Sequence, residues 1–123
     1  ARKGLLAKYV FAEAVGFVER ISRHLTGTAR VRFTACFSDG RTLYAVRYAT
    51  DAHAPTLFAA PMGGKGGYCL VSEPLNDETD TWVEIPAGSA VILDAKGLDA
   101  AKFEPAWEPE PKGERMPAPA MAL

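Results

Sequence analysis

Asp39 and Gly40 stand between two runs of strand-forming residues, and Asp-Gly in that setting is the strongest short-range signal for a two-residue β-hairpin. If these two residues form the turn, paired positions have numbers that sum to 79, and Arg32 lies opposite Arg47. Two like charges at facing positions repel one another unless an anion lies between them. The register therefore predicts a carboxylate or another anion near that face of the hairpin.

An amphipathic helix is predicted over residues 5–25, before the hairpin. Its apolar residues recur at intervals of three and four, which gathers them on one face that we expect to be buried. Gly27 is placed to end the helix in a left-handed conformation, and Gly16 costs about 1 kcal/mol relative to Ala, which predicts a close neighbour there. The apolar face consists of Leu6, Val10, Ala14, Phe17, Val18, Ile21 and Leu25.

Four more strands are predicted after the hairpin, at residues 55–60, 68–71, 81–85 and 89–94. The first two are joined by a glycine-rich loop, and the last two pair across a turn at residues 86–88. One helix followed by about six mainly antiparallel strands is an α+β layout, in which the sheet packs against the helix. The strands are apolar on both faces in places, and one helix covers only one face. The sheet therefore needs a second layer, for which the chain has little sequence left.

Composition excludes several classes of partner. The chain holds 14 Lys+Arg against 15 Asp+Glu, a net charge of -1, with no basic block that would attract nucleic acid or anionic lipid. No apolar run approaches the roughly 20 residues that cross a bilayer, and the N-terminus lacks a signal-peptide pattern, so we expect a cytoplasmic protein. Cys36 and Cys69 form neither a disulfide framework nor a metal-ligand spacing, and both are expected to be reduced thiols that pack within strands.

The length fits a single hydrophobic core. We expect one domain over residues 1–103 and a proline-rich tail over residues 104–123. The tail has five prolines and no sustained periodicity, which is typical of a segment that lies on the surface or is disordered.

Three local patterns invite a chemical interpretation, but a structural one is favoured for each. The loop at residues 63–67 has no Ser or Thr after Gly-Lys and opens onto a strand, so it predicts a hairpin connection rather than a phosphate site. The acidic residues 76–80 lack the alternating ligands and central glycine of a calcium loop. His24 and His53 lie in different elements, and a Cys–His pair needs a proximity that sequence does not show. We therefore expect no catalytic residue, no metal site and no cofactor in this chain.

Residues 72–75 and 82–89 form the most specific pattern in the chain. A strand ends in Ser-Glu-Pro-Leu, a short acidic loop follows, and Trp-Val-Glu-Ile-Pro-Ala-Gly-Ser turns the chain into the next strand. With other segments in the same order, this pattern resembles the class II glutamine amidotransferases, which are N-terminal nucleophile hydrolases, and within them the stand-alone bacterial branch. The resemblance spans about residues 9–94. The other segments are residues 32–35, 38–40, 43–48 and 55–57.

The resemblance implies a fold and a division of roles. In that family the nucleophile is a cysteine at residue 1, whose own α-amino group is the base, and the fold is a four-layer αββα sandwich. Position 1 is Ala1 here. The family's glutamine-binding arginine and its Asn-Gly oxyanion pair belong to the half of the domain that precedes this position. The chain is therefore expected to be the C-terminal half of the sandwich, the scaffold portion of a glutaminase-type amidohydrolase.

As such a scaffold, the chain is expected to partner the N-terminal half of its own domain, with glutamine or a related amide as substrate of the complete domain. Ser72 and Glu73, at a strand end, are expected nearest to that substrate, although a structural role in the turn is the simpler explanation. The alternative is a non-catalytic interaction or regulatory module of the same fold. A coding sequence that continues upstream to a Met-Cys start would favour the enzyme. A homo-oligomer is left open.

Overall fold

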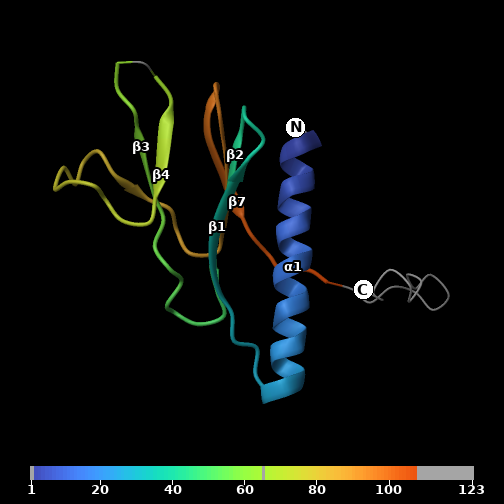
Figure 1. The fold of residues 1–123 in the computed structure, drawn as a ribbon. Helices are drawn as coiled ribbons and strands as arrows, with labels where there is room; N and C mark the ends of the chain where they lie inside the picture. The colour runs from blue at the N-terminus through green and yellow to red at the C-terminus, as the bar shows by residue number, and fades with distance from the viewer. Residues whose placement is uncertain (1, 65, 108–123) are drawn as a thin grey trace, which may run out of the picture.

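The computed structural model describes residues 2–64 and 66–107 and shows one long helix beside two antiparallel sheets (Figure 1). Within these residues, no helix is both long enough and apolar enough to cross a membrane. The predicted α+β class is confirmed, with seven strands in the described part where about six were expected. In chain order the elements are α1 (Arg2–Thr26), β1 (Arg32–Ser38), β2 (Leu43–Ala49), β3 (Phe58–Pro61), β4 (Tyr68–Val71), β5 (Val83–Glu84), β6 (Ser89–Asp94) and β7 (Gly97–Lys102).

These elements form three layers, with a four-stranded sheet between α1 and a three-stranded sheet (Figure 1). The strand order is β1-β2-β6-β7 in the first sheet and β4-β3-β5 in the second. One core lies between helix and sheet around Val15 and Val46, and the other lies between the sheets around Ala45, Ile85 and Val91. Successive residues of β2 therefore serve different cores. The expectation that too little sequence remained for a second layer is wrong, because β3, β4 and β5 supply it.

The β1–β2 hairpin has a longer turn than the sequence predicts. Ser38 pairs with Leu43, so paired numbers sum to 81 and four residues form the loop. Asp39 explains the difference, because its Oδ1 accepts hydrogen bonds from the backbone N–H groups of Arg41 and Thr42, both at 2.9 Å. The register differs by two positions rather than one, so every residue keeps its predicted face of the sheet.

Arg32 and Arg47 consequently do not face each other, and this part of the prediction is wrong. Arg32 pairs with Ala49 across the hairpin instead. Carboxylates do lie near both arginines, as expected, but each arginine has its own. Arg32 binds Asp51 at 2.8 Å, and Arg47 binds Glu84 at 2.9 Å.

Helix α1 turns a different face to the sheet from the predicted one. Val15 is buried, and the ring of Phe11 packs edge-on against Phe33 and Phe37 at centroid distances of 5.7 and 5.5 Å. The helix is apolar on two sides, and the side that carries Phe11 meets the aromatic rings of β1. The predicted buried face is therefore exposed. Its described members are Val10, Ala14, Phe17, Val18, Ile21 and Leu25, whereas the side chain of Leu6 lies outside the described part.

Both glycine predictions for α1 are confirmed. Gly27 has a φ of 82°, and its N–H donates to the carbonyl four residues earlier at 2.8 Å, which ends the helix. A Cβ at Gly16 would lie 2.8 Å from the backbone nitrogen of Trp107. The missing side chain thus lets the C-terminal segment cross α1, where the N–H of Ala106 donates to the carbonyl of Ala12 at 2.9 Å.

The strand predictions after residue 80 are partly wrong. Strand β5 pairs with β3 and not with β6, so the turn at residues 86–88 carries the chain from one sheet to the other. Strand β7 is absent from the prediction because Gly97–Lys102 contains no β-branched or aromatic residue, and it forms by pairing along β6. Residues 103–107 then reach α1, while residues 108–123 of the predicted tail lie outside the described residues.

Stability should depend on pH through Tyr48, whose hydroxyl donates a hydrogen bond to Glu19 of α1. Burial and then the bond to Glu19 raise the pKa of Tyr48 from 10.0 to about 12. In the unfolded chain this hydroxyl loses its proton at a lower pH than in the folded chain. Its contribution to the free energy of unfolding is therefore complete below pH 10 and is lost as the pH rises to about 12. We expect Tyr48→Phe to remove this part of the alkaline loss in urea unfolding. Tyr68→Phe, the matched control, should leave it unchanged, and an identical pH profile for both variants would contradict the assignment.

Candidate functional site

Ser72 and Glu73 directly follow β4, and both are exposed. The carbonyl of Ser72 accepts a hydrogen bond from Oγ1 of Thr56 at 2.7 Å, which ties this strand end to the segment before β3. Across the acidic loop, Nε1 of Trp82 donates to Oδ1 of Asn76 at 3.0 Å. The most specific sequence pattern is thus a closed loop with its own hydrogen bonds. The proximity of Ser72 and Glu73 to a substrate stays a prediction.

Arg47 is a buried charged residue at the junction of the two sheets, with 8% of its surface exposed. Its Nη1 donates to Oε2 of Glu84 at 2.9 Å and to the carbonyl of Ile85 at 2.5 Å. Its Nε and Nη2 donate to the carbonyls of Pro55 at 3.0 Å and Ala54 at 3.2 Å. Four of the five guanidinium N–H groups are therefore used within the chain. Arg47 joins β2 to the second sheet and keeps little capacity for a substrate carboxylate.

Sequence reasoning predicted an anion near Arg47 but missed that the arginine joins the two sheets, although a signal for this was present. The alternation of β2 places Arg47 on the same face as Leu43 and Ala45, and a charge on an apolar face needs a partner. Its partner Glu84 lies in the other sheet. No spacing along the chain reveals that contact.

A second charged group, around Asp51, is exposed. Nε and Nη2 of Arg32 donate to Oδ2 of Asp51 at 3.1 and 2.8 Å, and the backbone N–H of His53 donates to Oδ1 at 2.9 Å. The hydrogen bonds from Arg32 and then from His53 hold the pKa of the Asp51 carboxyl below its usual value. His24 lies in the last turn of α1, a separate element. The group is a solvated ion pair with a loop turn, and it contains no nucleophile.

The two cysteines have different surroundings. Cys36 is exposed on the edge strand β1, and Cys69 is partly buried in β4, both as reduced thiols. The prediction that both thiols pack is therefore wrong for Cys36. Across residues 2–64 and 66–107, no group of three or more His, Cys, Asp or Glu side chains could hold a metal ion. The glycine-rich loop joins β3 to β4, and the N–H of Met62 donates to the carbonyl of Gly67 at 2.8 Å, as the hairpin interpretation requires.

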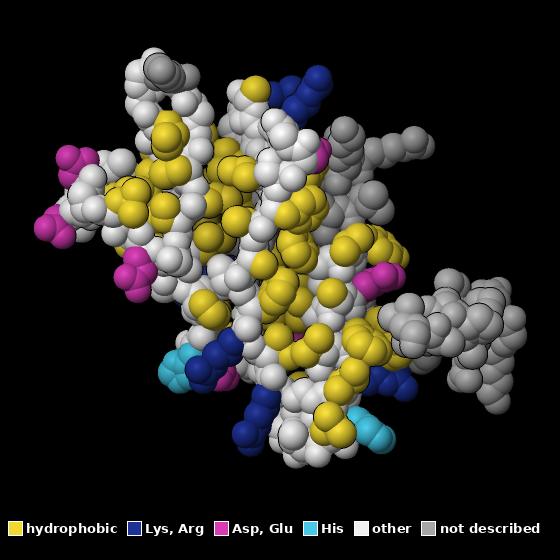
Figure 2. All heavy atoms as spheres, in the orientation of Figure 1, with side chains coloured by type: hydrophobic (Ala, Val, Ile, Leu, Met, Phe, Trp, Pro, Cys, Tyr) yellow, Lys and Arg dark blue, Asp and Glu magenta, His cyan; other side chains and the backbone are white. Residues whose placement is uncertain are grey.

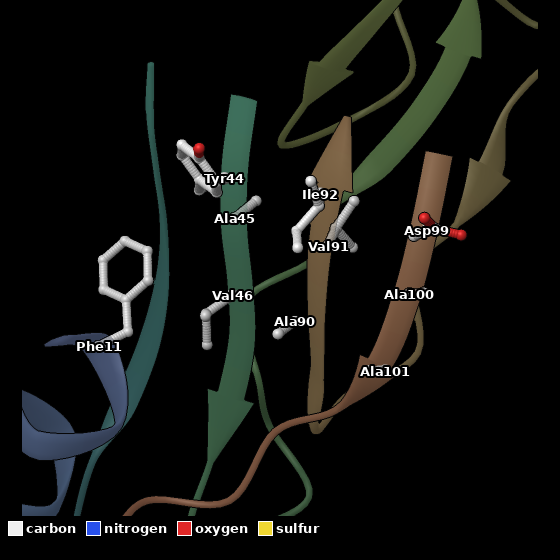
Figure 3. A pocket seen from close by; sticks show the side chains of 10 residues that line it. All are labelled: Phe11, Tyr44, Ala45, Val46, Ala90, Val91, Ile92, Asp99, Ala100 and Ala101. Atoms are coloured by element: carbon white, nitrogen blue, oxygen red, sulfur yellow. The ribbon is translucent and has the colours of Figure 1, made fainter. Parts of the chain in front are cut away.

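A hollow of about 280 Å³ opens beside α1 over β2, β6 and β7 (Figure 3). Phe11 forms its helix side, and the small or short side chains of Val46, Ala90 and Ala101 lie on its floor. Asp99 is the one charged residue of the lining. The lining carries no nucleophile and no metal ligand set. The hollow suits apolar side chains of another protein segment better than a reacting substrate. The sequence did not predict the hollow, because alanines are not a signal for a binding site.

No protein-family model and no curated protein matches this chain. Its structure is similar to a solved structure of a glutamine aminotransferase class-II domain protein from Silicibacter pomeroyi, with 38% sequence identity and a TM-score of 0.69. The similarity covers 77% of this chain and 43% of that one, so the chain spans less than half the length of the protein it matches. The chain therefore has the α+β fold of a class II glutamine amidotransferase, and its helix and two sheets correspond to half of an αββα sandwich.

Proposed function

We propose that this chain is the scaffold portion of a class II glutamine amidotransferase-type amidohydrolase. The complete domain hydrolyses the side-chain amide of glutamine or a related amide through a thioester. The observation that carries the proposal is the 38% identity over 77% of the chain to a protein described as a glutamine aminotransferase class-II domain.

The nucleophile of the proposed reaction lies outside this chain. An N-terminal nucleophile needs a thiol and a free α-amino group on the same residue, so that the amine can act as the base. Cys36 and Cys69 both lie within strands, where their nitrogens are part of peptide bonds. Neither cysteine therefore meets the requirement of this mechanism.

The partner in this proposal is the N-terminal half of the same domain. The described residues form one helix and two sheets, the content of half a sandwich, and the hollow beside α1 leaves part of the four-stranded sheet uncovered. Large apolar side chains are also exposed on the three-stranded sheet and its loops, and a second half would remove them from water. These side chains are Met62 and Tyr68, which are 60% and 40% exposed.

The role of the scaffold is to hold the segment before β3 and the end of β4 in a fixed conformation. Arg47 fixes the segment before β3, and Thr56 of the same segment holds the carbonyl of Ser72. Ser72 and Glu73 are the residues that we place nearest to the substrate of the complete domain. Their position follows from the Arg47 junction rather than from any contact with a ligand.

A glutamine-derived diazoketone tests the proposal, because it alkylates a cysteine that attacks the glutamine side chain. The protein is isolated at its full natural length, incubated with the reagent, digested and analysed by mass spectrometry. We expect loss of glutamine hydrolysis and a label on an N-terminal cysteine outside residues 1–123. A label on Cys36 or Cys69 that abolishes hydrolysis would overturn the proposal. Absence of both label and hydrolysis would favour the non-catalytic interaction or regulatory module.

A further inference from the structure

The exposed C-terminal half of α1 combines apolar and basic side chains. Phe17, Ile21 and Leu25 are 43%, 41% and 74% exposed, and Arg20 and His24 lie beside them. A hollow of about 820 Å³ runs along these side chains. Hydrophobic and basic side chains also gather at the lower end of the molecule in Figure 2. We call these five residues the helix patch.

Residues 75–83 form a lobe of opposite character, which we call the acidic lobe. From residue 66 to residue 95 the sequence contains six Asp or Glu and no Lys or Arg. Leu75 and Val83 are 75% and 60% exposed among these carboxylates. The indole of Trp82 fixes the loop by its hydrogen bond across it, so binding by the lobe costs little ordering entropy.

Charge distinguishes two ways in which copies of the chain could meet. Helix α1 contains five Lys or Arg and two Glu, so pairing of α1 with α1 would bring like charges together. The acidic lobe instead brings carboxylates to the Arg20 guanidinium of the helix patch and apolar side chains to its apolar residues. We propose that the helix patch of one chain binds the acidic lobe of a second copy.

Such a contact is heterologous, because its two surfaces lie on different elements of the chain. Each copy that joins keeps one unused surface of each kind, so copies add head to tail. The inference goes beyond the proposed function, since it concerns a surface that the amide chemistry does not use. Failure of the labelling experiment would leave it unchanged.

Sedimentation equilibrium of the full chain with two charge-reversed variants tests the inference. One variant combines Glu78→Lys with Asp80→Lys in the acidic lobe, and the other combines Arg20→Glu with His24→Glu in the helix patch. Each variant alone should self-associate at least about tenfold more weakly than the unaltered chain, because like charges then face each other. An equimolar mixture should recover the association, because the reversed lobe meets the reversed patch and the unaltered patch of one variant meets the unaltered lobe of the other. Raised salt should weaken the association of the unaltered chain.

Several results would overturn the inference. The unaltered chain could stay monomeric at every protein and salt concentration, or both variants could associate as it does. Loss of association in the helix-patch variant alone would mean that another part of the second copy, such as residues 108–123, binds there. Circular dichroism checks that each variant folds. If a reversed variant does not fold, Glu78→Gln with Asp80→Asn supplies a milder change that should still weaken the association.

Discussion

Replacing Arg47 by methionine is expected to lower the free energy of unfolding by about 3 kcal/mol, the low end for breaking a buried ion pair. The substitution removes the donor from the buried carbonyls of Ala54 and Ile85 and from the carbonyl of Pro55, and it leaves Glu84 without its cation. The low end applies because the Glu84 side chain is 55% exposed and water can solvate it. Urea unfolding followed by circular dichroism measures the change, with the slope of the transition as a check on two-state behaviour.

Arg32→Met is the matched control for this prediction. Arg32 also pairs with a single carboxylate, that of Asp51, but its side chain is 57% exposed. Exposed ion pairs contribute little because water screens them and the long side chains lose entropy. We expect the unfolding midpoint of Arg32→Met to stay close to that of the unaltered chain. Equal loss in both variants would show that Arg47 acts by its charge alone and not by its buried hydrogen bonds.

Gly16→Ala is expected to destabilise the chain, although alanine is the better helix former. The new Cβ would lie 2.8 Å from the backbone nitrogen of Trp107 and 2.9 Å from the carbonyl carbon of Ala106, so the backbone must move. Overpacking typically costs about 1 to 3 kcal/mol. The gain in helix propensity is about 1 kcal/mol, so a net loss of up to about 2 kcal/mol remains. Thermal unfolding and the fluorescence of Trp107, whose ring lies 5.2 Å from that of Phe17, report the displacement.

A shortened chain provides the control for the Gly16 prediction. In a chain that ends at Pro105, the backbone atoms that oppose the new Cβ are removed, and the same substitution should stabilise by up to about 1 kcal/mol. The sign of the effect should therefore reverse between the two backgrounds. A stabilising effect of Gly16→Ala in the full chain would show that the segment around Ala106 does not pack against α1.

Local patterns predicted most of the elements but not how they meet. Short stretches of sequence predict the helix, the first hairpin and the strand before each turn. The signals are the spacing of the apolar residues and the residue types that favour turns. The hairpin register depends on the Asp39 side chain, whose Oδ1 accepts hydrogen bonds from the backbone N–H groups of Arg41 and Thr42 and so stabilises a four-residue loop. The orientation of α1 could not be predicted from its own sequence, because both sides are apolar and the rings of Phe33 and Phe37 decide between them.

The candidate site shows the same limit more strongly. Sequence marked Ser72 and Glu73 through a pattern, whereas the best-connected polar side chain of the junction is Arg47. Its partners come from the segment before β3 and from the end of β5, and both belong to the other sheet or lead into it. The alternation of side chains along β2 predicts that Arg47 is buried, but only the packing of the two sheets shows which groups accept its hydrogen bonds.

The crossing of the chain between its two sheets also constrains the order in which they form. Leu43 of β2 pairs with Leu93 of β6, 50 residues later, and all three strands of the second sheet lie between them in the sequence. Contacts of such long sequence separation slow folding, because a large loop must close before they form. During synthesis, the ribosome releases β3, β4 and β5 before β6. The second sheet can therefore collapse early and shorten the loop that β6 has to close.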